Sequence, residues 1–78
     1  MPSYYFHIRD RDRLIEDPDG SELPDLEAAR AEAAAAAREA FAELTRAGRA
    51  IGDRRFEIAD GAGRVLATVG LRDVVVLH

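Results

Sequence analysis

Cysteine, lysine, asparagine and glutamine are all absent from this chain of 78 residues. Without cysteine the protein can form neither a disulfide nor a thiolate metal site. Its two histidines, His7 and His78, are too few for a histidine-rich zinc or iron site. We therefore expect no metal and no other cofactor, and oligomerisation is the remaining means of reinforcing so small a core.

Long apolar runs are also lacking. Residues 1–7 have no basic region leading into an apolar stretch, so they do not resemble a signal peptide. No window approaches the roughly 20 apolar residues that cross a bilayer. We expect a cytoplasmic protein that makes no membrane contact.

Positive charge is in short supply, because 11 arginines face 15 acidic residues and the net charge is −4. Such a domain has no general attraction for nucleic acid, which we do not expect as a partner. Arginine and aspartate alternate over residues 9–13, so the arginines there project on one side of an extended chain. The aspartates cancel most of their field, and the pattern favours an ordinary charged hairpin over a phosphate or RNA site.

Alanine, by contrast, is abundant, and 11 of the 15 alanines fall between Ala28 and Ala47. The pattern predicts a helix from about Leu26 to Ala47, because Asp25 can cap the first amides and Gly48 ends the pattern. The apolar stripe of this helix is nearly all alanine in its middle. Its small side chains predict that the helix lies unusually close to the sheet.

Four further segments read as strands bounded by turn-forming residues. These segments are residues 3–9, 13–16, 55–59 and 64–69. They predict a single small α+β domain over residues 1–78, a ββαββ antiparallel sheet with the alanine-rich helix packed on one face. The β-branched run at residues 74–77 is a possible fifth C-terminal strand. The strand order does not follow from the sequence.

Several short motifs of this chain occur in the order found in one protein family. They are Tyr5-Phe6-His7-Ile8, Asp17-Pro18-Asp19-Gly20 with Glu22-Leu23, Leu26-Glu27-Ala28-Ala29-Arg30, and Asp60-x-x-Gly63-Arg64-Val65-Leu66. Together they resemble a family of short bacterial proteins, domain of unknown function 6894, over nearly the whole chain. The resemblance implies a single bacterial domain and supplies no catalytic residue. The hairpin followed by an acidic helix is also similar in layout to antitoxin domains of toxin–antitoxin pairs, which is an analogy of fold.

Catalytic constellations are hard to assemble from these residues. Nucleophilic catalysis requires a hydroxyl or thiol beside a base, yet Ser3 lies four strand positions from His7, about 13 Å away. A phosphate-binding loop requires glycines that lead into a helix, whereas Gly61 and Gly63 lie between two strands. We therefore expect a protein that is not an enzyme.

The strand alternation divides the side chains of the sheet between two faces. The set expected to face the helix is Tyr4, Phe6, Ile8, Phe56 and Ile58. The set expected to face away is Tyr5, His7, Arg9, Arg55 and Glu57. His7 could then lie near Glu57 across the hairpins, which makes a proton-transfer or ligand site possible. We favour a solvated or interfacial cluster, because an aromatic side chain among polar neighbours suits a protein contact.

Three apolar residues near the end of the chain, Val74, Val75 and Val76, complete the candidate interaction surface. An uncovered apolar edge strand invites pairing with another chain. This segment docks in its own sheet, pairs with a second chain and builds a dimer, or forms a disordered tail.

The sequence by itself does not establish a function. The leading hypothesis is a non-enzymatic protein-interaction module that self-associates, as a dimer, or binds another protein. The first alternative is an antitoxin-like regulator that binds a toxin partner or nucleic acid. The second alternative is a small-ligand binder or weak enzyme centred on His7.

Overall fold

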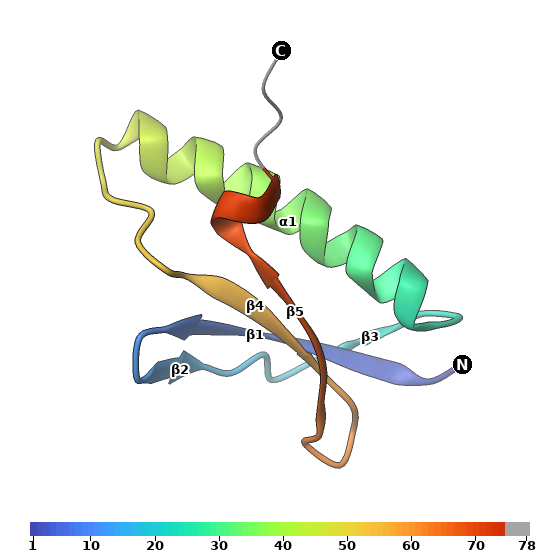
Figure 1. Ribbon diagram of the computed structural model, residues 1–78. Coiled ribbons are helices and arrows are strands. Elements are labelled where there is room, and N and C mark those ends of the chain that lie inside the picture. Colours follow the sequence, from blue (N-terminus) through green and yellow to red (C-terminus); the bar gives the residue numbers. More distant parts are fainter. Residues whose placement is uncertain (75–78) are drawn as a thin grey trace.

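One long helix lies diagonally across one face of a twisted sheet (Figure 1). The computed structural model describes residues 1–74. In chain order its elements are β1 (Ser3–Asp10), β2 (Arg13–Ile15), β3 (Ser21–Glu22), α1 (Leu26–Arg46), β4 (Arg55–Ala59), β5 (Val65–Gly70) and the 3-10 helix η1 (Leu71–Val74). The predicted α+β class, with two hairpins flanking one helix, is confirmed.

The sheet is antiparallel, with strand order β2-β1-β4-β5, and β3 also pairs with β1. The predicted hairpins are β1–β2 and β4–β5, and the pairing of β1 with β4 joins them. His7 lies opposite Glu57 in this central pairing, although 50 positions separate the two in the sequence. The strand order therefore brings together residues that are far apart in the sequence.

The fifth strand of the sheet is β3, which was not predicted from the sequence. Its two residues, Ser21 and Glu22, are polar and too few to show the alternation that marks a strand. The possible C-terminal strand at residues 74–77 falls mostly outside the described residues. Val74, the part that is described, is the last residue of η1.

The helix begins and ends where its capping residues require. Asp25 accepts a hydrogen bond from the Ala28 amide through Oδ1 at 2.8 Å, as expected of an N-cap. At the other end Gly48 has φ 69°, and its amide and that of Arg49 donate to the carbonyls of Thr45 and Leu44. These two backbone hydrogen bonds around a glycine in the left-handed conformation form a Schellman motif. The helix predicted from the sequence is thus confirmed.

The core lies where the alanine stripe of α1 meets the helix-facing side of the sheet. Ala29, Ala33 and Ala37 are completely buried, one turn apart, and the largest fully buried side chains are Ile58 and Leu71. The remaining buried members of the cluster are Tyr4 and Phe56. Because alanine has no atoms beyond Cβ, the helix can approach the sheet closely, and a larger side chain there would overpack the core by about 1–3 kcal/mol.

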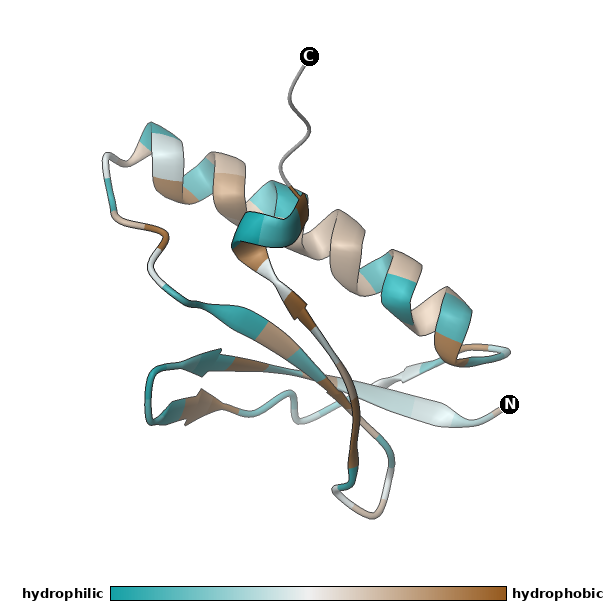
Figure 2. Ribbon diagram, viewed as in Figure 1, coloured by the Kyte–Doolittle hydropathy of each residue, from teal (hydrophilic) through white to brown (hydrophobic). Residues whose placement is uncertain are grey.

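The opposite face of the sheet is not covered by a second layer of described residues (Figure 1). Hydrophilic residues gather at the β1–β2 turn and in η1, whereas β5 is mostly apolar (Figure 2). Within residues 1–74, no helix is both long enough and apolar enough to cross a membrane.

Candidate functional site

The outward-facing set of side chains lies on the paired strands β1 and β4. Their register places Tyr5 opposite Ala59, His7 opposite Glu57 and Arg9 opposite Arg55. Residues directly opposite in an antiparallel pair point to the same face. The structure therefore brings all five predicted members of this set, from Tyr5 to Glu57, onto one surface.

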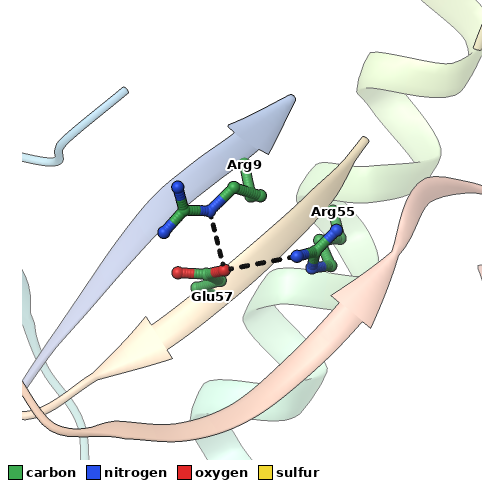
Figure 3. Close-up of polar contacts among 3 residues, drawn as sticks. All are labelled: Arg9, Arg55 and Glu57. Carbon is green, nitrogen blue, oxygen red and sulfur yellow. Dashed lines mark hydrogen bonds and ion pairs between the residues drawn. The ribbon is translucent and has the colours of Figure 1, made fainter. Parts of the chain in front are cut away.

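Glu57 is at the centre of this surface and is held by arginines from both strands (Figure 3). Its Oε2 accepts a hydrogen bond from Arg9 Nε at 3.1 Å, and Arg55 Nη2 lies 3.7 Å from the same oxygen. Glu57 is 8% exposed, so the two guanidinium groups compensate a carboxylate that has lost most of its contact with water. The Glu57 carboxylate is thus engaged in contacts that hold β1 and β4 together.

His7 makes its hydrogen bond to the segment that follows β2. Its Nδ1 accepts from the Asp17 amide at 3.0 Å, which places the proton of a neutral imidazole on Nε2. The ring also stacks on Tyr5, with centroids 6.3 Å apart and an interplanar angle of 20°. Although His7 and Glu57 are neighbours in register, their described hydrogen bonds run in different directions and form no proton-transfer pair.

Asp17 fills a gap in the edge of the sheet between β2 and β3. Its Oδ2 accepts from the Phe6 amide of β1 at 3.2 Å, where a backbone carbonyl of a continuous strand would otherwise lie. Its Oδ1 accepts from the amides of Asp19 and Gly20 at 3.1 and 3.2 Å and so closes the turn. One carboxylate thereby fixes both the edge of β1 and the loop that leads into β3.

The environment of Asp17 lowers the pKa of its carboxyl group below the ordinary value. Partial burial opposes this change and raises the pKa. The hydrogen bonds from the amides of Phe6, Asp19 and Gly20, together with nearby His7, outweigh that effect. The charged form is the one that these amides bind.

Gly20 is required in this loop for two reasons. Its φ of 70° lies in the left-handed region, and a Cβ built on it would lie 2.7 Å from Cε2 of Tyr5. The Tyr5 ring thus packs directly against the glycine backbone. Asp17 and Gly20 belong to the turn-forming residues that follow the predicted strand at residues 13–16, but nothing in the sequence indicates that this turn holds Tyr5 and His7.

A cleft of about 420 Å³ adjoins these residues on the outer face. It lies between the loop at residues 16–18 and the β4–β5 turn, and Tyr5 and His7 line it. Within residues 1–74, no group of three or more histidine, cysteine, aspartate or glutamate side chains can hold a metal ion. Nδ1 of His7, the acceptor nitrogen of the neutral imidazole, is already bonded to the Asp17 amide and is not free to take a proton from a ligand in the cleft.

The valines of the predicted interaction surface are not on this face. Val74 is half-buried at the end of η1 and packs against the core. Val75 and Val76 lie outside the described residues. The structure therefore brings together five of the eight predicted site residues and separates Val74 from them.

Comparison with known proteins gives one result that bears on identity. No curated protein and no solved structure matches the chain. A family model, Domain of unknown function (DUF6894), matches residues 3–72, which includes every strand and the helix described above. The chain belongs to this family, DUF6894.

Proposed function

We propose that this protein is a non-enzymatic interaction module that self-associates by pairing β5 with β5 of a second copy. The observation that carries the proposal is the composition of this edge strand. β5 has six residues, none of them charged, and among residues 1–74 it is hydrogen-bonded to β4 alone. A long uncharged edge strand is the surface on which further strands add.

A second copy is the partner that best fits this edge. Two β5 strands related by a twofold axis run antiparallel, so the interface is formed by the same residues of each copy. Because neither strand has a charge, the pairing creates no like-charge contact across the interface. Val65, which is 50% exposed in the monomer, lies on this strand and would lose solvent contact.

Part of β5 is more regular than the rest. The register with β4 shifts at Ala59, which leaves Leu66 as an extra residue, and the ladder is regular over residues 67–70. Thr68 lies in this regular part, is exposed, and faces the same side of the sheet as Glu57. Pairing is therefore expected to centre on Thr68 and its neighbours.

The small core supplies a reason for self-association. Ile58 and Leu71 are the largest fully buried side chains of the described residues, so the hydrophobic core of the monomer is small. Domains of this size often gain stability from oligomerisation when disulfides and metals are missing. The absence of catalytic pairing around His7 and Glu57 supports the non-enzymatic part of the proposal.

The test is solution mass by light scattering over a hundredfold range of dilution. We expect wild type to change from dimer to monomer on dilution, and the double variant Val65→Lys/Thr68→Lys to remain monomeric. The matched control, Leu14→Lys/Ile15→Lys, adds the same charge to exposed apolar residues of β2 at the other edge. It should associate as wild type does.

Two results would contradict the proposal. Wild type that stays monomeric throughout would show that β5 has no self-partner. Equal loss of association in the control variant would show that added charge, and not the β5 edge, was responsible. Circular dichroism of each variant confirms that the fold is retained.

A further inference from the structure

A second cleft, unrelated to the β5 edge, lies where the β1–β2 turn meets the connector between α1 and β4. Figure 1 shows this turn and connector on the same side of the molecule. The cleft has a volume of about 580 Å³, within the range of small-ligand sites. Four arginines line it, namely Arg11, Arg13, Arg54 and Arg72.

Arg54 is fixed in position by contacts from two different segments. Its Nε donates to Asp10 Oδ2 of β1 at 3.3 Å, and its Nη1 donates to the Ala50 carbonyl of the connector at 2.7 Å. A guanidinium group has five N–H donors, so these two bonds leave others for a ligand. Arg54 is therefore a preorganised fork in the wall of the cleft.

Arg11 occupies a backbone position that disfavours its side chain. Its φ is 60°, and it is the one residue other than glycine with positive φ among those described. It lies in the two-residue turn between Asp10 and Arg13, which glycine or asparagine would fill with less strain. Strain that the fold retains at one residue supports a hypothesis of function, and here the strained residue lines the cleft.

The charges around the cleft favour an anion. Asp10, Asp12 and Asp53 also line it, but Asp10 is paired with Arg54. Apart from that ion pair, three arginines and two aspartates line the cleft, so the net charge of its lining is positive. A cation would need a cluster of carboxylates, and none of metal-binding size occurs in the described part of the chain.

We propose that this cleft binds the phosphate group of a small ligand. Arginine forks match the oxygens of a phosphate group and can donate two parallel hydrogen bonds to it. Arg54 supplies a fixed donor at the junction, while Arg11 supplies donors from the turn, Arg13 from the start of β2 and Arg72 from η1. The volume of the cleft leaves room for an organic part attached to the phosphate.

The test is an NMR titration with inorganic phosphate, sodium glycerol phosphate and sodium acetate, each at constant ionic strength. We expect saturable shifts of the amides of residues 10–13 and 50–54 with both phosphates, and weaker shifts with acetate. Tighter binding of glycerol phosphate than of inorganic phosphate would identify an ester as the ligand. Tighter binding of inorganic phosphate would identify the free ion.

The substitution Arg11→Gly separates function from structure, because the two effects have opposite signs. Glycine relieves the left-handed strain, so the thermal midpoint should rise by about 4 °C. Loss of one charge-assisted contact should raise the phosphate dissociation constant about tenfold. Arg72→Gln, an exposed site outside the turn, should weaken binding without raising the midpoint.

The control is Arg38→Gln, which removes an exposed arginine of α1 and should leave phosphate binding unchanged. The proposal is overturned by shifts that never saturate or that spread evenly over the surface. It is also overturned if Arg11→Gly and Arg72→Gln bind phosphate as wild type does. None of these outcomes depends on the oligomeric state, so they are separate from the test of the β5 edge.

Discussion

The two edges of the sheet are built in opposite ways. At one edge β1 is covered by two short strands, β2 and β3, and Asp17 fills the interval between them with its carboxylate. At the other edge β5 is a single strand of six uncharged residues. An edge that is short, charged and interrupted resists the addition of another strand, whereas an uncharged edge with a regular stretch, here residues 67–70, favours it. Among residues 1–74, therefore, this small sheet is closed at one edge and open at the other.

Removing the Asp17 carboxylate should have the largest effect, because the closed edge depends on it. Asp17→Ala leaves the amides of Phe6, Asp19 and Gly20 without their acceptor, and we expect a loss of about 3 kcal/mol in the free energy of unfolding. Urea denaturation followed by circular dichroism measures it.

Asp19→Ala is the matched control for this prediction. Asp19 is exposed, lies in the same loop, and contributes its backbone amide to the turn. We expect a change within about 0.5 kcal/mol. Equal destabilisation by both substitutions would mean that loop charge, and not the bond to Phe6, holds the edge.

A second, smaller effect should follow from adding one methyl group to the same loop. Gly20→Ala forces a left-handed residue and a contact with Tyr5, so we expect a loss of about 2 kcal/mol in stability. Gly61→Ala is the control, because a Cβ there meets no atom within 4 Å. Thermal unfolding of both variants decides whether the packing of Tyr5 on the loop matters.

The closed edge should also weaken in acid. The pKa of Asp17 is lower in the folded protein than in the unfolded chain, so unfolding takes up a proton at acidic pH. The contribution of this carboxylate is fully present above its ordinary pKa, about 4, and is lost as the pH falls through the folded value. The stability difference between wild type and Asp17→Ala should therefore shrink below about pH 4. A difference that stays constant in denaturation curves down to acidic pH would contradict this.

Charge added to the open edge should have the smallest effect on the isolated monomer. Thr68 is exposed, so Thr68→Lys should change the free energy of unfolding of dilute protein by less than about 0.5 kcal/mol. If β5 pairs with a second copy, the midpoint of wild type rises with protein concentration and that of Val65→Lys/Thr68→Lys does not. Calorimetry at several concentrations compares the two.

Local elements were well predicted because their causes lie within a few residues. Asp25 and Gly48 mark the ends of α1 in the sequence as they do in the structure. The alternation of apolar and polar residues predicted the two central strands, β1 and β4. The turn at Asp60 is equally local, because its side chain accepts hydrogen bonds from the amides of Ala62 and Arg64. The strand β3 was missed because two polar residues have no pattern.

The candidate sites were predicted less completely. The sequence placed Tyr5, His7, Arg9, Arg55 and Glu57 on one face, since alternation along a strand determines the face of each residue. It did not predict which polar atoms meet: Glu57 lies opposite His7, as expected, but its carboxylate is bonded to Arg9. The cleft that joins Arg54 to Asp10 was not predicted either, because its walls come from segments far apart in the chain.

The sequence by itself determined the helix, its caps, the main strands and the division of their side chains between core and surface. These features depend on hydrogen bonds and periodicities that span a few residues. The tertiary structure decided the strand order, the role of Asp17 at the edge of β1 and the meeting of Arg54 with Asp10. Those features depend on how β1 and β4 pair across the chain, and the local pattern of either strand is compatible with other partners.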